Sequence, residues 1–217
     1  MMKKSFISSI IFSLFCISGI SNPPDEWEFW TRHSATALIN EKIEFRISQQ
    51  FNMNRLMEDM YFHYSEAAIS YEFKEWFFTT MVFRQTFKHN GENWIKEPRP
   101  YINTTAEIES SKWTFTFRNR AVFRYFRENR NYLRLREKLG LSYDIDFENF
   151  LLTPFVSGDL WYATDRKEIE RYQQYAGIWI TPVETLDVGL HYIGNLVNQE
   201  TDWQLVNAYR VSLSIGL

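Results

Sequence analysis

The sequence predicts an all-β protein, a single closed antiparallel transmembrane β-barrel of about 10–12 strands. Three observations predict this fold: long segments in which polar and apolar residues alternate, breaks that alternate between short and long, and a leader at the amino terminus. Strands of ordinary sheets run about 5–6 residues. A tilted strand that crosses a bilayer needs about 9–11, with apolar side chains outside and polar ones inside.

The first of these observations is clearest between Trp113 and Tyr143. Each half has one apolar and one polar face, and the break RENR separates the halves. In the first half the apolar face carries Trp113, Phe115, Phe117, Ala121, Phe123 and Tyr125, and the polar face carries Thr114, Thr116, Arg118, Arg120 and Arg124. In the second half the apolar face carries Leu133, Leu135, Leu139, Leu141 and Tyr143, and the polar face carries Arg134, Arg136, Lys138 and Ser142. Alternation with period two predicts two long strands joined as a hairpin.

The amino terminus has the organisation of a secretory signal peptide. Residues 1–4 are basic, residues 5–20 are apolar, and Gly19 and Ser21 supply the small residues that precede a cleavage site. We therefore expect cleavage before Asn22.

Cleavage would leave residues 22–217 as the barrel and would remove Cys16, the only cysteine. A mature chain without cysteine has no disulfide and no thiolate metal ligand. The alternatives are a membrane anchor, for which the apolar stretch is short, and a lipoprotein attached through Cys16, which follows the bulky Phe15.

Eleven strand-like segments follow the spacer Pro23-Pro24. They cover residues 27–38, 43–52, 60–73, 76–88, 99–109, 113–126, 131–145, 150–162, 171–181, 186–196 and 204–217. Short breaks alternate with longer polar ones, as in bacterial barrels with short periplasmic turns and long outer loops. Because single-chain bacterial barrels normally have even strand numbers, either residues 27–38 are not a full strand or one strand has been missed or merged. A soluble β-sandwich, the alternative fold, has shorter strands.

The last segment predicts the cellular location. Tyr209, Val211, Leu213 and Ile215 alternate with polar or small residues and the chain ends at Leu217, where an outer-membrane barrel usually ends in an aromatic residue. We therefore expect insertion into a bacterial outer membrane by the barrel-assembly machinery, in contact with membrane lipid and lipopolysaccharide. The net charge of −3 gives no basic excess for a nucleic-acid partner.

The order of these features resembles the family called domain of unknown function 2490, bacterial outer-membrane barrels. The matching stretches are Trp27 to Leu38, FRNRAVFRYF with YLRLREKL, TPFVSGDLWY, RYQQYAGIWI, DVGLHYIGN and AYRVSLSIGL. The sequence departs from the family at Gln173-Gln174-Tyr175, where Gln-x-Arg is expected, and at Asp159, where Glu is usual. The resemblance implies location and fold, and the family carries no activity to transfer.

Strand parity predicts a lumen filled by roughly balanced charges. The proposed network comprises Arg118, Arg120, Arg124, Arg134, Arg136, Lys138, Glu107, Glu109 and Asp159. With DFEN as the turn, Arg136 faces Asp159 and Lys138 faces Ser157. Across the other break, Arg124 falls near Arg134 and Arg120 near Lys138. Facing cations in a wall of low dielectric need acids beside them, so we expect Asp159 to bridge Arg136, and Glu107 and Glu109 to meet Arg118 or Arg120.

Two polar residues face outward by the same parity. Asn119 and Glu137 lie near the middle of their strands as diagonal neighbours, where a charge facing lipid is costly. Either a β-bulge turns Glu137 inward, which we favour, or a contact between protomers in a homo-oligomer covers the pair.

Three classes of function remain open. The first is a structural or surface-binding barrel with a charge-filled lumen, and the second is a narrow pore for small solutes. The third is a lipid-modifying enzyme, for which His191, Asp187 and Asn195 face inward near Ser212 and Ser214. No cofactor is expected, and no HExxH or paired-His spacing predicts a metal site. Asp165, Glu168 and Glu170 fall in an expected loop, where a weakly bound divalent cation or simple solvation would explain them.

Overall fold

The structure, a computed structural model, describes residues 27–54, 59–125, 131–198 and 202–217. The expected signal peptide, residues 1–21, lies outside the described residues. Within these ranges no helix is long and apolar enough to span a membrane.

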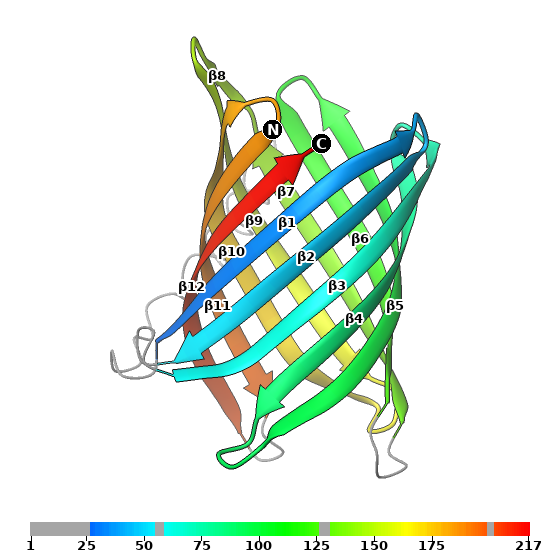
Figure 1. Ribbon diagram of the computed structural model, residues 1–217, viewed down its shortest axis with the longest axis vertical. Helices are drawn as coiled ribbons and strands as arrows, with labels where there is room; N and C mark the ends of the chain where they lie inside the picture. The colour runs from blue at the N-terminus through cyan, green and yellow to red at the C-terminus, as the bar shows by residue number, and fades with distance from the viewer. Residues whose placement is uncertain (1–26, 55–58, 126–130, 199–201) are drawn as a thin grey trace, which may run out of the picture.

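The described chain forms twelve strands (Figure 1). They are β1 (Glu28–Asn40), β2 (Ile43–Asn54), β3 (Asp59–Lys74), β4 (Phe77–His89), β5 (Trp94–Ser110), β6 (Trp113–Arg124), β7 (Tyr132–Tyr143), β8 (Ile145–Phe147), β9 (Phe150–Ala163), β10 (Glu168–Val183), β11 (Leu186–Asn198) and β12 (Trp203–Gly216). Eleven of them close into one barrel, each hydrogen-bonded to its neighbours in chain order. The short β8 pairs only with β9 and extends the β7–β9 hairpin beyond the barrel wall.

The barrel closes through a parallel pair. β1 lies alongside β12 from Glu28 opposite Ala208 to Thr36 opposite Gly216, whereas every other neighbouring pair is antiparallel. The prediction of a wholly antiparallel barrel is therefore wrong at this one seam. With an odd number of up-and-down strands, the first and the last run in the same direction, so the odd count is real and residues 27–38 belong to a full strand.

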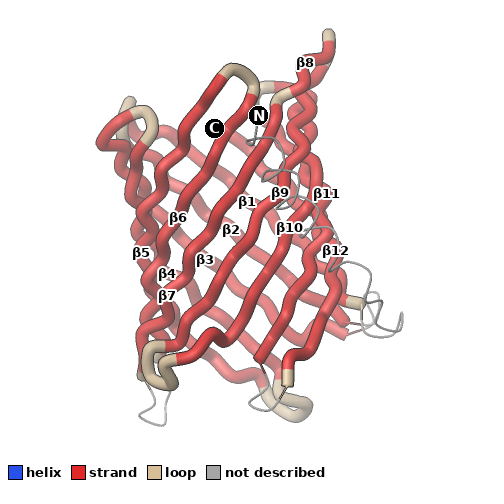
Figure 2. The backbone as a smooth tube through the Cα atoms, turned by 180° about the vertical axis from the view of Figure 1, so that it is seen from behind, coloured by secondary structure: helices blue, strands red, loops and turns tan. Residues whose placement is uncertain are grey.

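The two ends of the barrel differ in their connections (Figure 2). At one end, here called the turn rim, two-residue turns join the strands at residues 41–42, 75–76, 111–112, 148–149 and 184–185. The other end, the loop rim, carries the described connections 90–93 and 164–167. The carboxyl end of β12 lies at the turn rim (Figure 1).

Local chemistry explains the tight turns. The Asn40 side chain accepts hydrogen bonds from the backbone N–H groups of Lys42 and Ile43, both at 2.9 Å, which is the usual role of Asn at a turn. Ser111 adopts a φ of 58° in the β5–β6 turn. Beside it, Lys112 donates to Asp146 at 2.9 Å, and this hydrogen bond and its charge raise the pKa of the Lys112 amine.

The barrel is apolar outside and polar inside. Outward apolar side chains are exposed, such as Leu139 (65%), Met81 (62%) and Phe83 (55%). Inward side chains such as Glu66 and Gln173 are buried. A soluble protein has the opposite arrangement, whereas a membrane barrel has this one.

Aromatic side chains gather near both rims. Trp113 and Tyr143 lie 4.7 Å apart, ring centre to ring centre, near the turn rim. Near the loop rim His63 stacks on Phe87 at 4.5 Å and meets Trp94 at 5.1 Å. His63 thus belongs to the outward aromatic group near the loop rim.

Candidate functional site: the barrel lumen

The lumen contains a cavity of about 1100 Å³. Its wall includes Glu41 and Glu75 at the turn rim, and Lys88 and Gln204 near the loop rim. The cavity therefore follows the barrel from one end towards the other, and the inward side chains do not fill it.

Positive charge dominates the described part of this wall. Eleven arginines and three lysines line the cavity, against seven glutamates and one aspartate. Nearly balanced charge was expected. Most of the excess lies within the predicted network, where six cations and two acids line the cavity. Inward cations outside that network, among them Arg32, Arg99 and Arg171, add to it.

Glu66 is the centre of one buried ion-pair cluster. One carboxylate oxygen accepts hydrogen bonds from Arg32 (2.9 Å) and Ser48 (2.7 Å). The other accepts two from Arg84, at 2.9 and 2.7 Å, and one from the Tyr101 hydroxyl at 2.8 Å. One buried carboxylate thus fixes side chains from β1, β2, β4 and β5.

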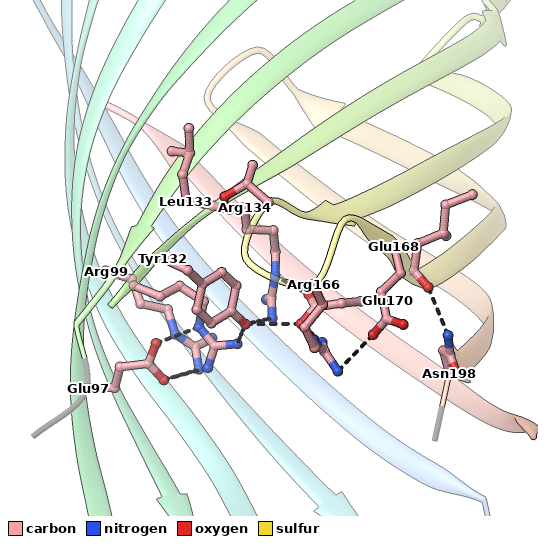
Figure 3. A network of polar contacts seen from close by, with 12 residues as sticks. Glu97, Arg99, Tyr132, Leu133, Arg134, Arg166, Glu168, Glu170 and Asn198 are labelled. Carbon is pink, nitrogen blue, oxygen red and sulfur yellow. Dashed lines mark hydrogen bonds and ion pairs between the residues drawn. The ribbon is translucent and has the colours of Figure 1, made fainter. Parts of the chain in front are cut away.

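Glu97 organises a second cluster near the loop rim (Figure 3). Its two oxygens accept hydrogen bonds from Arg124 at 2.6 and 2.8 Å, the double contact that a guanidinium makes with a carboxylate. Arg99 donates to the same group at 2.6 Å. The sequence prediction missed Glu97 because β5 begins at Trp94, not at residue 99. Alternation through Glu97, Arg99 and Tyr101 was the available signal, and the outward Pro98 and Pro100 obscured it.

Glu170 completes this cluster (Figure 3). It forms an ion pair with Arg134 at 2.5 Å and accepts a hydrogen bond from the Tyr132 hydroxyl at 3.0 Å. Glu168 and Glu170 lie in β10, so placing them in a loop was wrong. Glu168 pairs with the exposed Arg166 at 2.9 Å, and Asp165 remains in a turn.

Four cations form a compact group in the middle of β6 and β7. Arg118 lies opposite Lys138 and Arg120 lies opposite Arg136, all four facing the cavity. We call Arg118, Arg120, Arg136 and Lys138 the cation block. Directly opposite positions place Cβ atoms about 4.5–5.5 Å apart, so like charges are held side by side.

The acid nearest to the cation block is Asp159. It lies opposite Lys138 on β9, is 4% exposed and accepts a hydrogen bond from Arg136. The predicted Arg136–Asp159 ion pair is thus present. Elsewhere in the block Arg120 donates to the Asn103 side chain at 2.6 Å. Within the described residues no carboxylate lies at ion-pair distance from Arg118, Arg120 or Lys138.

Aromatic rings support the cation block from the side. Arg136 lies over Trp161 at 3.8 Å, Arg120 over Tyr101 at 4.3 Å, and Lys138 is 5.2 Å from the Tyr175 ring. Cation–π contacts hold such groups in place without neutralising them.

Two register predictions need correction. Asp159 faces Lys138 and Ser157 faces Gly140, a shift of two residues, because the hairpin turn is Glu148–Asn149 and β8 continues the strand through Phe147. Across the loop rim Arg124 faces Tyr132, and Arg134 faces Val122. A register shift of two residues leaves every side chain on the same face of the sheet. The residues predicted to face the lumen therefore still face it.

The predicted contact of Glu107 and Glu109 with Arg118 or Arg120 is wrong. Glu107 lies opposite Thr116 and lines the cavity nearer the turn rim, and Glu109 is exposed opposite Thr114. Neither forms an ion pair with a described residue.

The favoured explanation of Asn119 and Glu137 is also wrong. The β6–β7 register runs without a shift through these residues, which lie directly opposite each other, outward and exposed. A bulge therefore does not hide Glu137, and the contact between protomers stays a prediction.

His191 is buried in the lumen wall, and among the described residues no hydrogen bond joins it to Asp187, Ser212 or Ser214. Its Nδ1 atom lies 3.1 Å from an Arg210 nitrogen, and its ring packs on Trp179 at 4.9 Å. The Asp187 carboxylate accepts a hydrogen bond from Thr181 at 2.6 Å. Among the residues with described positions, no group of three or more His, Cys, Asp or Glu is arranged to hold a metal ion.

Comparison with known proteins gives one family. A family model described as "Protein of unknown function (DUF2490)" matches residues 27–206. No curated protein matches the chain.

Proposed function

Since the chain belongs to the DUF2490 family, whose description states no activity, we propose a function from the barrel itself: a narrow outer-membrane pore for small anionic solutes. The observation that carries this proposal is the cavity of about 1100 Å³ whose described wall holds more cations than acids. A structural or surface-binding barrel is the second candidate, and the filled parts of the lumen favour it.

Membrane insertion is supported by the surface of the barrel. Apolar side chains cover the outside, and aromatic groups lie near both rims. Outer-membrane barrels have this arrangement, with short turns in the periplasm and longer loops outside. We therefore assign the turn rim to the periplasm and expect cleavage of residues 1–21 during export.

Fractionation of cells tests the location. The protein should be recovered with outer membranes and should migrate faster on SDS gels before boiling than after it. Recovery of folded protein from the soluble periplasm would contradict membrane insertion.

Anion preference follows from the charge of the wall. A barrel of eleven strands lies between filled eight-stranded barrels and open porins of 16–18 strands. Because arginine and lysine dominate the wall, anions are favoured in a lumen whose low-dielectric surroundings strengthen the field.

Apolar contacts narrow the same lumen. Trp30, Ile193 and Ala208 form a buried cluster, with Tyr175 packed against it. Solutes must pass beside this cluster, so the proposal is limited to small molecules and ions.

Conductance of the purified barrel in a planar bilayer tests the pore. We expect small discrete steps and, in a gradient of KCl, a reversal potential of the sign given by chloride permeation. A matched pair of variants gives the control: Arg118→Gln should reduce the anion preference, and Lys96→Gln, which changes a loop-rim lysine outside the cavity lining, should not. A sealed bilayer would favour the structural or surface-binding barrel.

A further inference from the structure

We infer that the cation block binds a small oxyanion carrying about two negative charges, inorganic phosphate or a phosphate monoester. This inference rests on the proposed function only in requiring that solutes reach the lumen. It names the solute and the residues that hold it: Arg118, Arg120, Arg136 and Lys138.

The cation block differs from the other charged clusters of the lumen. Glu66 lies between Arg32 and Arg84, and Glu97 lies between Arg99 and Arg124. In each, one carboxylate of the chain forms ion pairs with two guanidinium groups. The cation block has a different composition, since its four cations share one ion-paired carboxylate, Asp159.

The charge of the block selects the ligand. Four cations and one carboxylate leave a surplus of three positive charges. A phosphate group carries about −1.5 to −2 at neutral pH and three acceptor oxygens, so it neutralises more of this surplus than chloride or a monocarboxylate does.

Hydrogen-bond donors point to the same ligand class. The Nε atoms of Arg118 and Arg136 are buried without a hydrogen-bond partner in the described structure. A buried donor without a partner loses its solvation without gaining a hydrogen bond, and guanidinium groups match the spacing of phosphate oxygens. The rings of Trp161 and Tyr101 hold Arg136 and Arg120 in position, which lowers the cost of ordering them on binding.

The position of the block favours a free solute over a lipid headgroup. All four side chains line the cavity from the middle of β6 and β7. A lipid headgroup stays at the level of the rims while its acyl chains remain in the bilayer, whereas a soluble phosphate reaches the middle of the lumen.

Equilibrium binding of radiolabelled inorganic phosphate to the purified full-length barrel in detergent tests the site. Ionic strength is held constant with KCl, so that general screening is the same throughout. We expect saturable binding at one site per barrel, with competition by glycerol phosphate and weaker competition by acetate. Absence of saturable binding of inorganic phosphate would overturn the inference, and so would binding of labelled short-chain phosphatidic acid by a barrel that does not bind inorganic phosphate.

Substitutions assign the site. Arg118→Gln should weaken phosphate binding about tenfold, the loss expected for one charged hydrogen-bonding partner. Lys88→Gln removes a cation from the loop-rim end of the same cavity and should leave binding within about twofold if the charge acts locally. Equal losses in the two variants would show a diffuse field in place of a site.

Asp159→Asn gives a readout that does not depend on Arg118. It frees Arg136 for the ligand, so phosphate should bind more tightly and should raise the unfolding temperature of Asp159→Asn more than that of the wild type. An unfolding temperature that phosphate leaves unchanged in both proteins would contradict the inference. The mobility of unboiled protein on SDS gels tests whether each variant is folded. If phosphate binds to a barrel that does not conduct, the binding site stands although the proposed pore function fails.

Discussion

Replacement of Glu66 should destabilise the barrel more than any surface substitution. The Glu66 side chain is 1% exposed and accepts five hydrogen bonds, three of them from the charged Arg32 and Arg84. Removing one partner of a buried ion pair costs about 3–5 kcal/mol, because an uncompensated charge is left behind. Two arginines lose their partner here, but Arg32 is 29% exposed and regains some solvation. We therefore expect the upper half of that range for Glu66→Ala.

Unfolding by urea in lipid vesicles, followed by tryptophan fluorescence, measures this loss. Glu66→Gln keeps the volume of the side chain, so a similar loss in it attributes the effect to charge and not to a cavity. Asp165→Ala is the matched control, since Asp165 is an exposed turn residue without an ion pair in the described structure, and it should change the free energy of unfolding by less than about 0.5 kcal/mol. A Glu66→Gln protein as stable as the Asp165→Ala control would refute the reasoning.

Three further predictions follow from the register. Asp159→Ala should lower the free energy of unfolding by about 3–5 kcal/mol in phosphate-free buffer, and a loss no larger than that of Asp165→Ala would mean that its pair with Arg136 contributes nothing. Cysteines introduced by Asn119→Cys and Leu135→Cys should cross-link two protomers in native membranes, since the exposed Glu137 needs a cover in lipid; a barrel that stays monomeric under cross-linking speaks against this contact. Finally, Ser34→Cys with Ser214→Cys should cross-link within one chain across the parallel seam, with Ser34→Cys and Ser48→Cys as the antiparallel reference. Cross-linking in the reference alone would rule out the seam.

The strands could be predicted because alternation is a local property of the chain. The eleven predicted segments overlap the eleven barrel strands, and the closing strand begins at Trp203, one residue before its expected start. β5 was the weakest case. Its first residues, Trp94 to Pro98, resemble a loop by composition, yet they pair with β4, Trp94 lying opposite His89 and Pro98 opposite Gln85.

Register and closure depend on non-local pairing and were harder to predict. Moving the turn to Glu148–Asn149 shifts every pair of the hairpin by two residues, and sequence composition does not distinguish these neighbouring turn positions. An odd number of up-and-down strands requires the first and last strands, β1 and β12, to pair in parallel. Because bacterial barrels usually have an even number of strands, the odd count itself was not expected.

The residues of the site could be predicted in part, because strand parity is a local property of the sequence. Parity placed Arg118, Arg120, Arg136 and Lys138 inward, as the structure does. The roles of Glu97 and Glu170 were missed because β5 and β10 begin earlier than predicted, at Trp94 and Glu168, so parity was not applied to these two glutamates.

The parallel seam also has a consequence for the dynamics of the barrel. It joins the first strand of the chain to the last, so its formation must await the whole polypeptide and closes the longest loop. Parallel ladders are slightly less stable per residue than antiparallel ones, although Leu217 adds a backbone hydrogen bond to Thr36 at 2.8 Å. We therefore expect the barrel wall to open locally first between β1 and β12. Amide protons of the β1–β12 pair should exchange with solvent deuterium before those of the β6–β7 hairpin. On heating, β1 and β12 should be the first neighbouring strands to separate.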